Sequence, residues 1–146
     1  MLHYLNGQFC ADNFSFILPD GFYLETVPEL CYEEGFGAWT PDKQNYIEWQ
    51  IEVDCGGTKE ELSKLFVPGT GMHLLEDIKE VEVNGVRGHM AFYRMRTDQV
   101  MEMRLGHPRG AHLCLLIRSG GNDIHALLET EDIKNVISGI HATDLD

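Results

Sequence analysis

Histidine is the residue type in this sequence that could most readily hold a metal ion or transfer a proton. The 146-residue chain contains seven histidines, and only His107 and His112, at the two ends of HPRGAH, are spaced so that their side chains could converge. Zinc sites usually contain close pairs of cysteine or histidine ligands, and this turn supplies no carboxylate or thiol of its own. The spacing therefore favours turn histidines over metal ligands, and we expect no metal and no cofactor.

The candidate nucleophiles lack a base at a spacing typical of catalysis. Ser119 lies in RSGGND after an expected strand, and His125 is the nearest base in the sequence, so a serine in a turn is the favoured interpretation. Cys114 lies in the middle of an expected strand, where a buried structural thiol is the usual case. A catalytic role for Cys114 stays open, because such a cysteine needs an accessible, electropositive setting and arginines lie on neighbouring strands.

The arginines are concentrated in one part of the chain. Residues 1–80 contain 15 acidic and four basic residues, whereas residues 81–146 contain nine acidic and seven basic residues. The planar guanidinium group suits carboxylates and phosphates. All the arginines lie between residues 87 and 118: Arg87, Arg94, Arg96, Arg104, Arg109 and Arg118. This segment is therefore the first candidate for a binding surface.

Alternation along the expected strands predicts which side chains share a face of the sheet. One face is expected to be almost wholly apolar, with Ala91, Tyr93 and Met95 beside the methionines and leucines of the next two strands. The other is expected to mix apolar and charged residues, and Glu48 and Glu52 would join it if their strand pairs into the same sheet. The mixed face is predicted to contain Met90, Phe92, Arg94, Arg96, Glu102, Arg104, His112, Cys114, Leu116 and Arg118.

Two interpretations of this mixed face are open. The favoured one is structural: Glu48, Glu52 and Glu102 form cross-strand ion pairs with the arginines, each worth a few tenths to about 1 kcal/mol. The functional one is a site for an anion or a protein partner. The candidate binding residues are then Arg94, Arg96, Arg104 and Arg118.

A second candidate surface is the segment CYEEGFGAWTPDKQNY, which combines acidic and aromatic residues. Glu33, Glu34 and Trp39 are its candidate binding residues. Exposed aromatic side chains often anchor interfaces. Aromatic residues are nevertheless more often part of the core, and that interpretation is favoured here.

The elements expected to position these residues alternate between strands and helices. Short strands are expected on either side of the turn Pro19-Asp20-Gly21 and in GFGAWT, followed by a longer strand in YIEWQIEVDC. TKEELSKLF is expected to be a helix capped by Thr58 in a capping box with Glu61. A hairpin follows, KEVEV-NG-VRGHMAFYRMR, in which Asn-Gly predicts a type I′ turn. The strands VMEMRL and AHLCLLIRS and a final helix in ETEDIKNVISGI, capped by Thr130, complete an α+β fold, a mostly antiparallel sheet with helices packed on it.

The order of these motifs resembles the PsbP-like fold. The motif F-x-x-P-x-G-[FW] is present as FILPDGF, and V-x-V-N-G-V-x-G is present as VEVNGVRG before two long strands. The group includes the photosystem PsbP proteins, a Ran-binding nucleotide-release factor, bacterial DcrB-type proteins and chaperones of type VI secretion effectors. The resemblance implies a single α/β/α sandwich domain over residues 1–146. It also implies a role in binding or assembly, without a shared catalytic site.

Composition excludes some classes of partner. With 24 acidic and 11 basic residues, the chain is poorly suited to bind nucleic acid or an anionic membrane. It has no apolar run of membrane-spanning length, and its first residues do not have the pattern of a signal peptide. Its four cysteines are widely spaced, which favours reduced thiols and a cytoplasmic location.

These observations lead to two functional hypotheses. The first is a non-catalytic protein- or peptide-binding module of the cytoplasm, whose partner is unknown and which could also form a homodimer. The alternative is a binder of a small anionic ligand, or a minor enzyme, that uses Arg94, Arg96 and Arg104 with His112 or Cys114 nearby.

Overall fold

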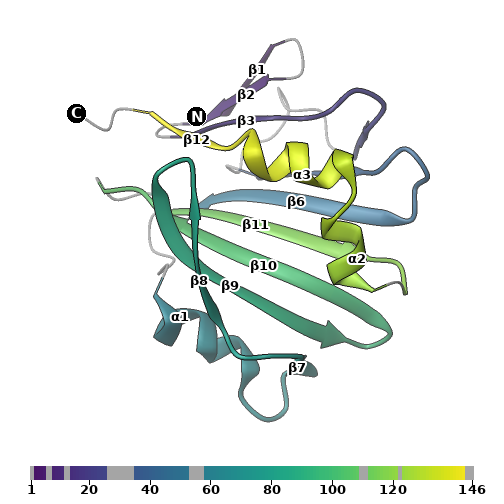
Figure 1. Ribbon diagram of the computed structural model, residues 1–146, viewed down its shortest axis with the longest axis vertical. Helices are drawn as coiled ribbons and strands as arrows, with labels where there is room; N and C mark the ends of the chain where they lie inside the picture. Colours follow the sequence, from purple (N-terminus) through teal and green to yellow (C-terminus); the bar gives the residue numbers. More distant parts are fainter. Residues whose placement is uncertain are drawn as a thin grey trace.

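The computed structural model describes residues 2–5, 8–11, 14–25, 35–52, 58–108, 112–121 and 123–143. Two antiparallel sheets and a few short helices make up this part of the chain (Figure 1). The strands of the smaller sheet are β1 (Leu2–Leu5), β2 (Gln8–Ala11), β3 (Phe14–Ile17) and β12 (His141–Ala142). Those of the larger sheet are β4 (Tyr23–Leu24), β5 (Gly35–Trp39), β6 (Asn45–Glu52), β7 (Met72–Leu74), β8 (Lys79–Val83), β9 (Val86–Met95), β10 (Asp98–Gly106) and β11 (His112–Ser119). The helices are α1 (Lys59–Ser63), the 3₁₀ helix η2 (Lys64–Phe66), α2 (Ile124–Leu128) and α3 (Glu131–Ser138).

The larger sheet has the strand order β4-β5-β6-β11-β10-β9-β7, and β8 also pairs with β9. Every pairing among the described strands is antiparallel. β8 pairs with the first half of β9 and β7 with its last residues, so both lie on the same side of β9. The expected α+β fold with a mostly antiparallel sheet is confirmed.

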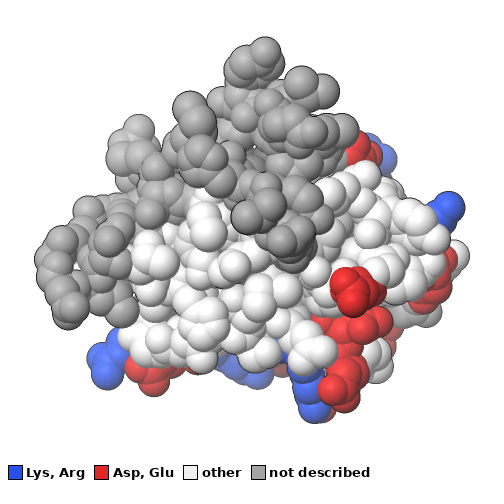
Figure 2. Space-filling view, turned by 90° about the horizontal axis from the view of Figure 1, so that it is seen from above, with Lys and Arg blue, Asp and Glu red and all other residues white. Residues whose placement is uncertain are grey.

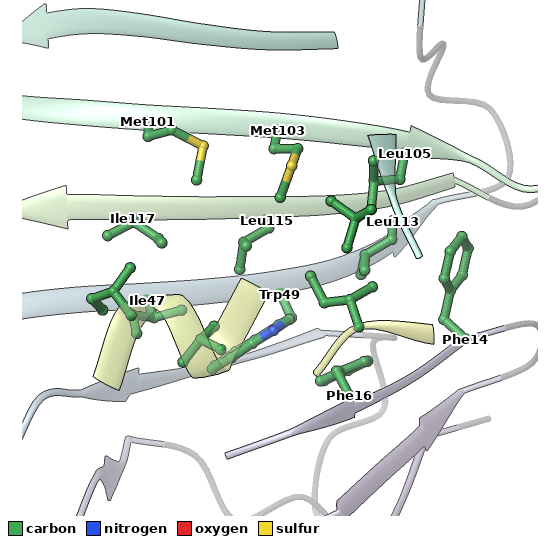
Figure 3. Packing of buried hydrophobic residues seen from close by; sticks show 14 of the residues in the cluster. Phe14, Phe16, Ile47, Trp49, Met101, Met103, Leu105, Leu113, Leu115 and Ile117 are labelled. Carbon is green, nitrogen blue, oxygen red and sulfur yellow. The ribbon is translucent and has the colours of Figure 1, made fainter. Parts of the chain in front are cut away.

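One face of the larger sheet, which we call the apolar face, forms the main core. β6, β10 and β11 contribute alternate buried side chains to it, and the smaller sheet, α2 and α3 cover them (Figure 3). Phe16 of β3 stacks on Trp49 of β6, with ring centroids 5.6 Å apart. Burial of large apolar side chains supplies about 1.5–3 kcal/mol each, so this face is the principal source of stability.

The opposite face, which we call the mixed face, carries a second, smaller core. Leu62 of α1 is fully buried against the sheet, and Leu65 and Phe66 of η2 pack beside it, as the predicted apolar stripe requires. Their partners on the sheet include Ala91, Tyr93 and Val100. Helices therefore lie on both faces of the larger sheet.

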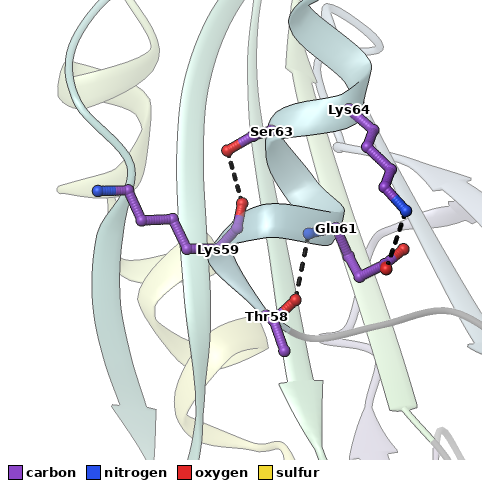
Figure 4. Close-up of polar contacts among 5 residues, drawn as sticks. All are labelled: Thr58, Lys59, Glu61, Ser63 and Lys64. Atoms are coloured by element: carbon purple, nitrogen blue, oxygen red, sulfur yellow. Dashed lines mark hydrogen bonds and ion pairs between the residues drawn. The ribbon is translucent and has the colours of Figure 1, made fainter.

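The local signals in the sequence determine where α1 begins. The Thr58 hydroxyl accepts a hydrogen bond from the Glu61 amide at 3.1 Å, as the predicted cap requires (Figure 4). The Glu61 carboxylate pairs with Lys64 at 3.0 Å, one turn onward (Figure 4). In α3, by contrast, the Thr130 hydroxyl donates to the Leu127 carbonyl and makes no cap, although Thr130 occupies the cap position.

The β8–β9 hairpin has the predicted turn. Asn84 and Gly85 both have positive φ, 48° and 85°, which is the type I′ geometry that Asn-Gly favours. The Asn84 side-chain amide also donates to the carbonyls of Ser138 and Ile140, at 2.8 and 2.7 Å. The turn is therefore fixed against the end of α3.

Five elements were not predicted from the sequence. These are the strands β1 and β2 of the first hairpin, the short strands β7 and β12, and helix α2. β7 begins at Met72, in the segment between the TKEELSKLF helix and the KEVEV hairpin, where no element was expected. β7 forms an edge of the larger sheet.

Candidate functional site

The β9–β10 hairpin determines which arginines share a face, and here the sequence-based grouping is wrong. The two strands are joined by Arg96 and Thr97, and Met95 lies opposite Asp98. Odd-numbered residues of β9 therefore pair with even-numbered residues of β10. As a result Ala91, Tyr93 and Met95 belong to the mixed face, whereas Met90, Phe92 and Arg94 belong to the apolar face.

Arg104 lies on the mixed face in a buried polar cluster. Its guanidinium group binds one oxygen of the Glu102 carboxylate through two nitrogens, at 3.0 and 2.9 Å. The Tyr93 hydroxyl donates to the other Glu102 oxygen at 3.0 Å. The Arg104 and Glu102 side chains are only 13% and 6% exposed, so this is a buried ion pair and not a surface one.

Burial within this cluster raises the pKa of Tyr93 well above its ordinary value of 10.0, and the neighbouring Glu102 carboxylate acts in the same direction. Tyr93 is therefore a neutral hydrogen-bond donor at physiological pH. A cavity of about 120 Å³ adjoins the cluster, lined by Glu48, Gln50, Glu102, Arg104, Cys114 and Leu116. Glu48 thus joins the mixed face as predicted, while the Glu52 side chain lies outside the described part of the structure.

Arg118 also lies on the mixed face, two strands from Tyr93. Its Nε is 3.5 Å from an Asp98 carboxylate oxygen, and its guanidinium carbon is 5.8 Å from the centre of the Tyr46 ring. Burial, with Glu25 close by, raises the pKa of Tyr46. Arg118 is therefore held by one carboxylate and one aromatic ring.

Arg94 and Arg96 lie elsewhere. Both are exposed, and within the described residues neither forms an ion pair. Arg94 is opposite His73 of β7 and projects from the apolar-face side of the sheet. Arg96 lies in the hairpin turn with a φ of 59°, a backbone conformation unusual for a residue other than glycine. The four candidate arginines thus form two separate pairs.

The edge strand β7 lies beside the second pair. The described chain places no strand on its outer side, and Figure 1 shows it at the lower margin of the sheet. Three apolar side chains around it are unusually exposed: Val67 by 51%, Leu74 by 40% and Leu75 by 39%. We call β7 with Val67, Leu75, Arg94 and Arg96 the β7 edge.

The acidic and aromatic candidates are only partly described. Glu33 and Glu34 lie outside the described residues. Trp39 of β5 is half-buried and packs at a tilt on Tyr46, with ring centroids 5.0 Å apart. Tyr46 of β6 thus contacts both Trp39 and Arg118, at the side of the sheet remote from β7.

The other candidates for chemistry have structural contacts. His107 is buried, and its Nε2 lies 2.6 Å from the Thr143 carbonyl oxygen. The Ser119 hydroxyl donates to the Gln99 carbonyl at 3.2 Å, whereas His125 packs on the Phe92 ring. Cys114 is a half-buried thiol in the wall of the small cavity.

Charge and membrane properties can be stated only for the described chain. Seen from above, the molecule has a largely uncharged described surface, with acidic side chains gathered toward one margin (Figure 2). None of the described helices combines the length and the apolar composition needed to cross a bilayer. The described residues also contain no group of three or more His, Cys, Asp or Glu placed to hold a metal ion.

Sequence reasoning missed the exposed apolar residues of the β7 edge. Val67, Leu74 and Leu75 flank PGTGMH, a segment with two glycines and a proline, and no strand was expected there. The only available signal was M-H-L-L, a short run with three apolar residues. Three or four residues are too few for periodicity to distinguish a strand from a loop.

Comparison with known proteins identifies the fold. No family model matches the chain, and no curated protein matches it. Among solved structures, the chain is similar to the Saccharomyces cerevisiae Ran-binding protein Mog1p, with a TM-score of 0.56 and 10% identity over 90% of this chain and 91% of that one. A mutant of Mog1 gives the same TM-score and identity, with 92% of its chain covered. At this identity the similarity shows the fold alone. The chain has a Mog1/PsbP-like fold, without a particular likeness to PsbP itself.

Proposed function

We propose that the chain is a non-catalytic protein-binding module that binds an extended segment of its partner at the β7 edge. The observation that carries this proposal is an edge strand with outward-directed backbone groups and exposed apolar side chains. Recognition by strand addition uses these two features, since main-chain hydrogen bonds supply affinity and alternate side chains supply specificity.

The register of β7 determines which of its backbone groups point outward. The Leu75 amide donates to the Phe92 carbonyl at 2.8 Å. In an antiparallel pair every second residue is bonded to its partner, so His73 and Leu75 direct their amides and carbonyls toward β9. Met72 and Leu74 direct theirs away from it. The Met72 amide donates to the Thr70 hydroxyl at 3.4 Å. Within the described residues, both backbone groups of Leu74 and the Met72 carbonyl remain available to a partner.

The apolar side chains make this edge unlike a protected one. Proteins usually guard edge strands by keeping them short or by placing charges or proline on them. β7 is short, but Leu74 and Leu75 project toward opposite faces of the sheet and are both about two-fifths exposed. Val67 adds a third exposed apolar side chain beside the strand. Such a surface favours a partner that covers it.

The alternative function, binding a small anionic ligand, has less support. The cavity beside Arg104 has a volume of about 120 Å³, whereas ligand pockets usually measure roughly 300–1,000 Å³. The Arg104 guanidinium group already binds Glu102, so an anion would have to displace a buried carboxylate. Arg94 and Arg96 lie too far along β9 to complete a site with Arg104.

The fold likeness supports a protein-binding role in a general way. Mog1p is a Ran-binding protein by name, and it has the same fold. We extend to this chain only the idea of a protein partner, not Ran itself. The acidic composition and the thiols of Cys10 and Cys114 support a cytoplasmic setting, which is part of the proposal.

Site-specific photo-crosslinking in the native cell extract tests the β7 edge as the binding surface. A crosslinking residue is placed at Val67, and a matched control carries it at the exposed Glu131 of α3. We expect a discrete set of protein adducts from position 67 that is absent from position 131. The adducts should disappear in a Leu74→Pro background. Proline removes the outward Leu74 amide, whereas the hydrogen bonds between β7 and β9 stay in place. Identical adducts from both positions, or adducts that persist with Leu74→Pro, would contradict the proposal.

A further inference from the structure

We infer that the segment bound at the β7 edge is acidic: an extended peptide in which carboxylates alternate with apolar residues. This inference rests on the proposed function and adds the chemistry of the partner to it. Its basis is that Arg94 and Arg96, the described arginines without an ion pair, lie beside an edge strand that has exposed apolar side chains and outward backbone groups. The chain has a net charge of −13, yet it presents two unpaired positive side chains where a partner strand would lie.

Arg94 is placed to reach a strand added to β7. It is opposite His73 across the β7–β9 pair, and both side chains are exposed on the same face. A new strand would lie two strand spacings from β9, about 10 Å. An arginine and a glutamate that extend toward each other over His73 can span that distance. The arginine fork can then bind the carboxylate through two nitrogens.

Arg96 is placed at the beginning of β7. It follows Met95, which pairs with Met72, the first residue of the strand. It lies in the exposed hairpin turn with a left-handed backbone conformation. Arg96 can thus meet a second carboxylate of the same segment, at the end of the added strand next to Met72.

The nearby acidic groups leave this positive site largely intact. Glu76, just after β7, is paired with Lys79 at 2.8 Å, and this pairing lowers the pKa of Glu76. Asp98, just after the hairpin turn, is paired with Arg118. Two nearby acids, Asp77 and Asp123, have no such partner among the described residues; Asp123 precedes Ile124, whose amide donates to the side chain of Gln99, the residue opposite Arg94. Asp77 and Asp123 both lie outside the strands, whereas Arg94 is opposite His73 of β7 and Arg96 follows the residue paired with Met72. The two arginines are therefore the unpaired charges next to the paired residues of β7, although the rest of the chain repels anions.

The net charge of the chain distinguishes a specific site for acidic peptides from nonspecific electrostatic attraction. A chain of net charge −13 attracts basic peptides at long range and repels acidic ones. Selection of acidic peptides by this protein would therefore have to come from a local site. Basic and apolar partners, and a second copy of the chain, are the competing occupants.

A selection from a random peptide library on the immobilised full chain tests the inference. We expect the enriched peptides to alternate apolar residues with Asp or Glu. Binding of a labelled enriched peptide, measured by fluorescence anisotropy, should weaken by about tenfold or more in the Arg94→Glu/Arg96→Glu variant, because two attractions become repulsions. The matched control is Arg87→Glu, at an exposed site near the other end of β9, which should change the affinity by less than about threefold.

Failure of the inference can be distinguished from failure of the proposed function. Enriched peptides that are basic or neutral, and that still lose binding with Leu74→Pro, would overturn the acidic partner and leave strand addition intact. Peptides unaffected by Leu74→Pro, or no enrichment at all, would overturn both. Leu74→Glu serves as a second variant if Leu74→Pro does not fold. A concentration-dependent dimer in sedimentation that dissociates with Leu74→Pro would make a second copy the occupant and would also overturn the acidic segment.

Discussion

Two pairs of arginines lie within 25 residues of each other in the sequence and have different surroundings in the structure. Arg104 and Arg118 lie on the mixed face, where a carboxylate holds each of them. Arg94 and Arg96 are exposed, and in the described chain no carboxylate pairs with either. The difference follows from the two-residue turn between β9 and β10. It indicates that arginines on adjacent strands can serve separate purposes, one stabilising the fold and the other available to a partner.

The comparison of the two arginine pairs predicts the largest effect on stability at the buried ion pair of Arg104 with Glu102. Arg104→Ala leaves the Glu102 carboxylate buried without its cation, and such a loss costs about 3–5 kcal/mol. Arg94→Ala removes only an exposed side chain and should change the unfolding free energy by less than about 0.5 kcal/mol. Urea denaturation of both variants measures this contrast.

The double variant Glu102→Gln/Arg104→Met controls for the loss of the cation, since it removes both charges and approximates the original volumes. It should recover most of the stability lost in Arg104→Ala. Equal stabilities for Arg104→Ala and Arg94→Ala would contradict the division into a structural and an exposed pair.

A smaller effect is expected at Tyr93. Tyr93→Phe removes the hydroxyl that donates to Glu102, and a hydrogen bond to a charged group is worth about 1.5–3 kcal/mol. We expect destabilisation near the lower end of that range, because Arg104 still holds the carboxylate. Thermal denaturation at neutral pH measures it. A variant as stable as the wild type would mean that the hydroxyl does not support the ion pair.

The same tyrosine predicts a dependence on high pH. The raised pKa of Tyr93 means that the folded protein keeps its phenolic proton above pH 10.0, where the unfolded chain releases it. Stability is therefore fully present below pH 10 and falls above it, by up to about 1.4 kcal/mol per pH unit for one such group. Chemical denaturation between pH 9 and pH 11 should show a shallower decline for Tyr93→Phe. Parallel declines for the two proteins would contradict the assignment.

A small effect on stability, of the opposite sign, is expected at Arg96. A residue other than glycine at positive φ costs about 1 kcal/mol or more, and part of this is offset by the greater freedom of glycine in the unfolded chain. Arg96→Gly should therefore stabilise the fold by about 0.5 kcal/mol while it weakens binding of an acidic peptide. Differential scanning calorimetry detects the first change and fluorescence anisotropy the second. A destabilised variant would show that the Arg96 side chain also supports the fold.

Much of the fold could be predicted because its signals are local. Asn84-Gly85 specifies its turn through positive φ, and Thr58 specifies the start of α1 through one hydrogen bond. The alternation of Ile47 and Trp49 predicts a buried face, which β6 has. Each of these signals acts within a few residues, so it can be recognised without knowledge of the neighbouring strands.

The candidate site could not be predicted in the same way, because it depends on register. Alternation within β9 and within β10 was identified correctly, yet their relative phase was not. That phase depends on whether the turn places Met95 opposite Asp98 or one residue away, and a shift by one residue moves every side chain to the other face. Arg96-Thr97 is not a residue pair that specifies a turn type. The edge strand β7 was missed because three residues carry too little periodicity.

The nitrogen-bound protons of the arginine side chains test the division between the two pairs most directly. Their exchange with water can be followed residue by residue in ¹⁵N NMR spectra of the wild-type protein, without any ligand. We expect the Arg104 Nε proton, buried and bonded to Glu102, to exchange far more slowly than those of Arg94 and Arg96. Equal exchange rates for Arg104, Arg94 and Arg96, or slow exchange at Arg94 and Arg96, would contradict the account.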